Sequence, residues 1–318
     1  MIVIRRDSEI YESEGGWFHA RWHFSFDRYS DPENDGFGAM RVFNDDRLIA
    51  GAIWPLHPHR DVEGITYVVE GTFGHEDNVG GAYGPMPAGS VQRMTLGSGA
   101  LHSEQNASQT EPMRFIQIWI LPDTAGLTPE VEQRIFTRED RINRLLKVVG
   151  PEGGAVVRVH QDAAVYLASL APGSEVAHSI GEGRGAYVYL IGGAATFDDQ
   201  DVSTGDAAKV TGQPELRIRA REQSELILVD VPMEFEPVGI WRGRICSGTT
   251  RISARHDMRR SGSAGQELSG GGVRVAARPG ERRRYRSDAP PRGGRSRPRR
   301  APGPPGSGTG AGADRGRS

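Results

Sequence analysis

The sequence predicts an all-β protein with two β-barrels in tandem, followed by a disordered tail. As far as about residue 236, short apolar runs alternate with Gly, Pro, Asn and Asp, which is typical of antiparallel strands and tight turns. The runs form two blocks with similar hairpin spacing, and from Pro237 the composition changes to Arg, Gly, Pro and Ser. We therefore divide the chain into a first barrel (1–136), a second barrel (137–236) and a tail (237–318).

The first block contains strands and one short helix. Residues 65–71 (ITYVVEG) predict a strand that ends at a turn. Residues 114–121 (RFIQIWIL) predict a longer strand with apolar residues on both faces, which places it inside a barrel or sandwich. Thr128 is a helix-capping residue type and Pro129 suits the first helical position, so we expect a helix as far as about Phe136.

The second block, from about residue 155 to 233, repeats the strand pattern. Residues 186–192 (AYVYLIG) and 224–231 (SELILVDV) are its clearest strands, and the turns at Pro172-Gly173 and at residues 191–193 resemble the hairpin spacing of the first block. The block contains His160 and His178, but neither belongs to a His-x-His pair. We expect the second barrel to be free of metal.

The tail and the body carry opposite charges. From Pro237 onward there are 19 Arg and 5 acidic residues, a net charge of about +14, whereas the preceding residues carry about −16. Such a tail cannot bury enough apolar surface to offset its ordering entropy. Its arginines could bind nucleic acid or an acidic partner by neutralising phosphates or carboxylates. An out-of-frame reading of GC-rich coding sequence would give the same composition, and both explanations stay open.

Cysteine content and hydropathy narrow the class of protein. The single cysteine, Cys246, excludes an internal disulfide framework and any thiolate-rich zinc or iron–sulfur site, so a metal would be held by nitrogen and oxygen. No apolar run approaches the ~20 residues needed to cross a bilayer. The first residues also lack the apolar stretch of a signal peptide. We expect a soluble, cytoplasmic protein.

Two short motifs carry side chains that bind metals. In residues 56–63 (LHPHRDVE), His57 and His59 are two positions apart, so both imidazoles point to the same side of a strand. In residues 99–104 (GALHSE), His102 and Glu104 have the same spacing. If the two strands are neighbours, three imidazoles and one carboxylate converge on one divalent first-row metal. A lone His-x-His pair is weak evidence, because hairpin histidines often form only local hydrogen bonds, but the second motif favours the metal site.

The residues around these motifs resemble a known family. Residues 51–63 (GAIWPLHPHRDVE) are similar to the first cupin motif, and residues 81–89 (GAYGPMPAG) to the start of the second. The histidine that cupins usually carry just after that point is missing, and Gln92 lies near its place. Residues 92–104 (QRMTLGSGALHSE) resemble instead the pirin signature Q-x-M-x-A-G-x-G-x-x-H-S-E, with Leu96 in place of Ala. Over about residues 1–235 the chain resembles the pirin branch of the cupin superfamily.

This resemblance implies a bicupin, with two double-stranded β-helix (jelly-roll) barrels and with the family's iron ligands at His57, His59, His102 and Glu104. The chain looks most like bacterial pirin-like proteins with quercetin 2,3-dioxygenase activity. In those proteins the metal binds a deprotonated flavonol, and dioxygen opens the heterocycle with release of carbon monoxide. Iron is the family default, although these ligands also accept Mn, Co, Ni, Cu and Zn. Glu104 could also be the catalytic base that takes the hydroxyl proton. The alternative within the family is a non-catalytic, iron-containing, redox-sensitive regulatory protein that binds a partner.

Other histidines carry weaker signals. His19 and His23 have the i, i+4 spacing of a helical zinc pair, but they lie among aromatic residues, which favours packing or hydrogen bonding. The segment His75-Glu76-Asp77 could line the entrance of the site. A solvated hairpin is the preferred interpretation of this segment.

Overall fold

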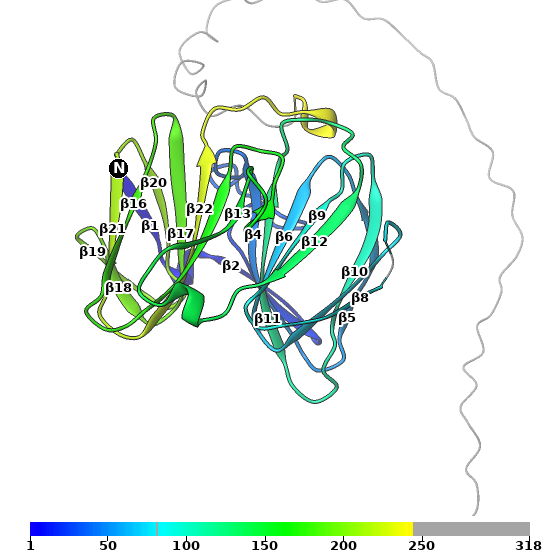
Figure 1. The fold of residues 1–318 in the computed structure, drawn as a ribbon, viewed down its shortest axis with the longest axis horizontal. Coiled ribbons are helices and arrows are strands. Elements are labelled where there is room, and N and C mark those ends of the chain that lie inside the picture. Colours follow the sequence, from blue (N-terminus) through cyan, green and yellow to red (C-terminus); the bar gives the residue numbers. More distant parts are fainter. Residues whose placement is uncertain (81, 244–318) are drawn as a thin grey trace, which may run out of the picture. The chain divides into compact units, whose positions relative to one another are not determined.

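The structure is a computed structural model that describes residues 1–80 and 82–243, and these residues form two β-barrels (Figure 1). The predicted all-β, two-barrel fold is thereby confirmed. Residues 244–318 lie outside the described part, and so do the predictions about most of the tail. Seven residues of the predicted tail, 237–243, are folded and include the short 3-10 helix η3 (Gly239–Trp241). Among the described residues, no helix is long and apolar enough to span a bilayer.

The first barrel closes a seven-stranded antiparallel sheet against a four-stranded one. The large sheet contains, in spatial order, β12 (Glu130–Ile135), β9 (Ser90–Thr95), β6 (Glu63–Glu70), β11 (Met113–Ile120), β4 (Met40–Leu48), β3 (Phe18–Trp22) and β2 (Tyr11–Gly15). The small sheet contains β5 (Ile53–His59), β10 (Ala100–Asn106), β7 (Thr72–Asp77) and β8 (Ala82–Pro87). The strands predicted at 65–71 and 114–121 are β6 and β11, which are hydrogen-bonded neighbours.

The second barrel repeats this arrangement. Its large sheet contains β1 (Ile2–Arg5), β20 (Ala207–Thr211), β17 (Arg184–Gly192), β22 (Ser224–Pro232), β15 (Ala164–Leu170), β13 (Leu146–Gly150) and β14 (Val157–Arg158). Its small sheet contains β16 (Glu175–Ser179), β21 (Glu215–Ala220), β18 (Ala194–Phe197) and β19 (Gln200–Ser203). The chain's first strand, β1, pairs with β20, so it belongs to the second barrel and not to the barrel that follows it in sequence. Two further 3-10 helices are η1 (Asp7–Glu9) and η2 (Glu139–Arg141).

The helix predicted after Pro129 is wrong. Residues 130–135 form β12, which pairs with β9 along its full length. The local capping signal of Thr128 and Pro129 is outweighed because β9, on its side away from β6, has backbone groups that need hydrogen-bond partners. Tertiary pairing therefore decides the state of this segment.

The two barrels pack through their large sheets. Phe43 on β4 lies 5.3 Å from Tyr187 on β17, measured between ring centroids, within one apolar cluster that contains residues of both barrels. A buried ion pair of the first barrel lies at the same contact: the Arg114 guanidinium is 2.6 Å from an Asp45 carboxylate oxygen, and the Tyr189 hydroxyl of the second barrel donates to that oxygen at 2.6 Å. Arg114 and Tyr189 hold the pKa of Asp45 below its usual value despite burial, so the pair stays charged.

The interiors of the two barrels differ in polarity. The second barrel is filled by one continuous apolar cluster. The first contains two separate apolar clusters. Its large sheet also carries a row of buried polar side chains at successive register positions: Asn44, Gln117, Thr66 and Gln92. Buried polar groups cost free energy unless they are hydrogen-bonded, so this row indicates a site.

Candidate metal centre

Three histidines meet on two neighbouring strands of the first barrel. His57 on β5 lies directly opposite His102 on β10, and His59 lies two residues further along β5. One ligand nitrogen from each ring can be chosen so that all three atoms lie within 4.8 Å of one another. The ring centroid of His57 is 4.7 Å from that of His59 and 4.5 Å from that of His102. The predicted adjacency of the two motif strands is therefore confirmed.

The hydrogen bonding of these rings suits a metal ion. Both ring nitrogens of His102 are buried and have no hydrogen-bond partner. The Nδ1–H of His57 donates to the carbonyl of Pro55 at 2.7 Å, which leaves the lone pair of Nε2 available. Burial, with the neighbouring imidazoles, lowers the pKa of His102 to about 2 and that of His59 to about 4. Neutral imidazoles are the form that binds metals, so these three residues could hold one.

Glu104 is not part of this three-atom group. It lies on the same face of β10 as His102 and is buried. Its Oε1 accepts a hydrogen bond from the Gln117 amide, and the Thr66 hydroxyl donates to the other end of that amide at 3.2 Å. Burial raises the pKa of Glu104 to about 7, and the Gln117 hydrogen bond opposes this rise. Gln117 therefore orients the one carboxylate that the sequence placed in the site.

His75 lies beside the site, and the interpretation of its segment as a solvated hairpin is wrong for this residue. Its side chain is buried, and its ring centroid is 5.6 Å from that of His102. The Gln92 amide donates to its Nδ1 at 3.2 Å, and its Nε2–H donates to Asp77 at 2.8 Å. Because both nitrogens are engaged, His75 does not offer a lone pair to a metal. Its burial follows from the pairing of β7 with β10, which no local signal in the sequence revealed.

Aromatic side chains form one wall of the site. Trp119 on β11 lies 4.6 Å from His59 in an edge-to-face arrangement, and Phe26 lies 5.5 Å from Trp119. Tyr83 lies 5.6 Å from His75. None of these residues was predicted for the site, because the segments that carry them lie outside both motifs.

The remaining described histidines lie outside the trio. His23 is fully buried and bonds the Tyr187 hydroxyl at 2.7 Å, and His19 contacts Glu12, so their predicted packing and hydrogen-bonding roles are confirmed. His178 bonds Asp230 at 2.6 Å. It lies opposite Leu216, whereas His57 lies opposite His102 in the first barrel.

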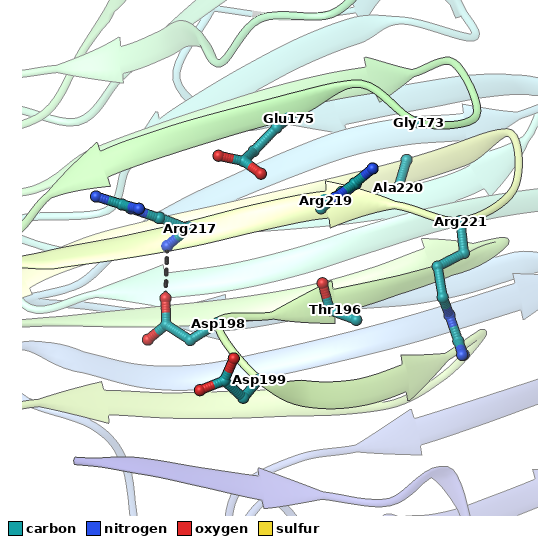
Figure 2. Close-up of a pocket in the computed structure, with 9 residues that line it drawn as sticks. All are labelled: Gly173, Glu175, Thr196, Asp198, Asp199, Arg217, Arg219, Ala220 and Arg221. Carbon is teal, nitrogen blue, oxygen red and sulfur yellow. Dashed lines mark hydrogen bonds between the residues drawn. The ribbon is translucent and has the colours of Figure 1, made fainter.

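A depression of about 910 Å³ lies on the second barrel, away from the trio (Figure 2). It covers the outer face of the β16-β21-β18-β19 sheet, and Arg217 and Arg219 rise from the central strand β21. Acidic residues face them: Asp198 accepts the backbone N–H of Arg217 at 2.9 Å, and Glu175 is the register partner of Arg219. The charges offset one another, as on a solvated sheet face.

The fold is that of a bicupin with three histidines that could hold a metal, and comparison with known proteins specifies the family. A family model described as "Pirin" matches residues 4–120, and one described as "Quercetinase C-terminal cupin domain" matches residues 147–231. The chain therefore belongs to the pirin family, as the motifs predicted.

Similar proteins are matched over nearly their full lengths. The chain is 38% identical over 234 residues to quercetin 2,3-dioxygenase of Escherichia coli strain K12, which covers 73% of this chain and 99% of that protein. It is 35% identical over 232 residues to a pirin-like protein of Caulobacter vibrioides, covering 72% and 99%. The crystal structure of the bacterial pirin YhhW from Escherichia coli in complex with nickel(II) superposes with a TM-score of 0.69 at 36% identity, covering 73% of this chain and 99% of that one.

Proposed function

We propose that this protein is a metal-dependent dioxygenase that opens the heterocyclic ring of flavonols such as quercetin and releases carbon monoxide. The convergence of His57, His59 and His102, with both nitrogens of His102 unpaired, is the observation that supports it best. Similarity to a full-length relative named quercetin 2,3-dioxygenase supports the substrate class. Iron is the metal that we propose, and the nickel in the related bacterial pirin supports a first-row metal at this fold.

In this proposal the three histidines hold the metal and Glu104 is the fourth ligand. A divalent metal bound there supplies Lewis acidity, which favours the deprotonated form of a flavonol hydroxyl. The His57 hydrogen bond to Pro55 fixes the ring orientation and directs Nε2 toward the other imidazoles. Four protein ligands leave up to two octahedral positions for substrate and dioxygen.

Glu104 would also move the proton of the substrate hydroxyl. Burial raises the pKa of Glu104 to about 7 in the metal-free protein, and a bound cation would lower it, so Glu104 would act as the base when it loosens from the metal. Because Gln117 donates to Oε1, Oε2 is the atom that would bind the metal and, once released from it, accept the proton. Trp119 gives a flat apolar wall beside His59, against which a planar aromatic substrate can pack while water is excluded.

Turnover by metal-reconstituted protein tests this function. Protein loaded with Fe, Mn, Co, Ni, Cu or Zn is supplied with quercetin, and oxygen uptake, carbon monoxide and ring-opened product are measured. We expect turnover with at least one metal, and its loss in His57→Ala but not in His19→Ala, which removes a histidine outside the site. Protein that binds one metal per chain and turns over with none of them would contradict the proposal; redox-dependent partner binding would then favour the regulatory alternative.

Glu104→Gln separates the two roles assigned to Glu104. Retained metal with lost turnover supports the base, and lost metal supports the ligand. Retained metal with unchanged turnover removes the base role.

A further inference from the structure

The chain that follows β22 leaves the second barrel and crosses onto the first (Figure 1). We call residues 235–241 the strap. Its two aromatic residues, Phe235 and Trp241, pack on an apolar cluster of the first barrel that also contacts Trp119. The other members of this cluster are Val62, Met94, Leu96, Ala100, Leu121 and Val131. The match to the second family model ends at residue 231, so the strap lies beyond both matched domains.

A single buried residue, Asp61, anchors the strap. Its backbone carbonyl accepts the Trp241 indole N–H at 2.7 Å. Its carboxylate accepts the backbone N–H of Ile240 at 3.2 Å and that of Gly126 at 2.9 Å. Asp61 has a left-handed backbone (φ 51), a conformation that Asp tolerates better than most residues, and this turns both of its oxygen-bearing groups toward the strap.

Asp61 is linked to both strands that carry the histidines, β5 and β10. Asp61 follows His59 by two residues. Its own N–H donates to the carbonyl of Gly97 at 2.9 Å, in the turn that leads into β10 and His102. Trp119, which shares the apolar cluster with the strap, contacts the ring of His59. The strap therefore rests on the same wall that borders the histidines.

We propose that the strap is a lid that closes the mouth of the metal-binding barrel and controls how readily solutes reach His59 and His102. The closed state is held by the two hydrogen bonds that Ile240 and Trp241 donate to Asp61 and by the packing of Phe235 and Trp241. This inference rests on the proposed function, because the lid would regulate access to the same metal site. Its test requires neither bound metal nor turnover.

Gly239→Ala is the variant that opens the lid. A Cβ at Gly239 would lie 2.2 Å from Asp61 Oδ2 and 2.4 Å from its Cγ, on a backbone with φ +54. The carboxylate cannot move aside without losing the amides of Gly126 and Ile240. Gly243→Ala is the matched control, because Gly243 also has a positive φ (+70) but a Cβ there would meet nothing within 4 Å.

The measurement is the rate at which diethylpyrocarbonate acylates each histidine of the metal-free protein, read by mass spectrometry. We expect Gly239→Ala to raise the rates at His59 and His102 about tenfold, the factor that corresponds to one net hydrogen bond. Gly243→Ala should leave both rates unchanged. His178, in the second barrel, is the internal reference for global loosening.

Trp241→Phe keeps the ring packing but removes the N–H donor to Asp61, and it should raise the same two rates by a smaller factor. Equal rates in Gly239→Ala and the parent chain would overturn the proposal. An equal rise in Gly243→Ala, or a matching rise at His178, would overturn it too, because backbone strain or general unfolding would then explain the result. A lid that opens as expected in a protein without flavonol turnover would leave this inference standing and sink only the dioxygenase proposal.

Discussion

Replacing Gln117 by Leu tests whether the polar row of the first barrel positions the metal centre. Leu is close to Gln in size but lacks the amide that donates to Glu104 and accepts from Thr66. Two buried groups then lose their partner, at about 1–3 kcal/mol each. The Gln117 hydrogen bond lowers the pKa of Glu104, so its loss should move that pKa above 7 and let protons compete better with the metal.

We therefore expect Gln117→Leu to bind metal about 10–100-fold more weakly at pH 7, as for other residues that orient metal ligands, and to recover part of the affinity as the pH rises. The assay is competition with a chelator between pH 6 and 8. Gln223→Leu is the control, because it removes an amide that bonds Ser169 and Leu170 in the second barrel. Unchanged affinity and pH dependence in Gln117→Leu would refute the positioning of Glu104 by this residue.

Three further predictions concern substrate, stability and pH. Trp119→Ala should raise the KM for quercetin about tenfold with metal content unchanged, because a stacking partner is lost; an unchanged KM would exclude Trp119 from the substrate wall. Arg114→Ala leaves the buried Asp45 carboxylate without its cationic partner, and should cost about 3–5 kcal/mol in urea unfolding; a loss below about 1 kcal/mol would contradict a desolvated ion pair. Burial lowers the pKa of His23 to about 3, so between about pH 6.5 and 3 only the unfolded state binds this proton. The free energy of unfolding should therefore decrease as the pH is lowered through this range, by up to about 1.4 kcal/mol per pH unit. This decrease should be less steep in His23→Phe, and equal slopes in the two proteins would count against the prediction.

The trio could be predicted because it depends on the regular geometry of strands. His57 and His59, two apart on β5, share a face, and the same rule aligns His102 with Glu104 on β10. The pairing of β5 with β10 contains a bulge, in which β5 has one extra residue between Trp54 and His57. The bulge lies outside the segment that carries the three imidazoles, so they stay close together. Only the adjacency of the two strands had to be assumed.

The residues that surround the trio could not be predicted, because long-range pairing places them. Gln117 and Thr66 are register partners on β11 and β6, and His75 is brought to the site by β7. The same cause explains why residues 130–135 form a strand against β9, and why β1 lies in the second barrel, where Ile2 and Ile4 pack on the apolar core. Local signals cannot specify a partner that is many residues away in the chain.

Metal stoichiometry tests the central claim most directly. Elemental analysis and native mass spectrometry of the purified protein should show one first-row metal per chain, and His102→Ala, which removes the imidazole with two unpaired nitrogens, should show almost none. A chain that binds no metal, or a His102→Ala variant that retains a full equivalent, would contradict the account.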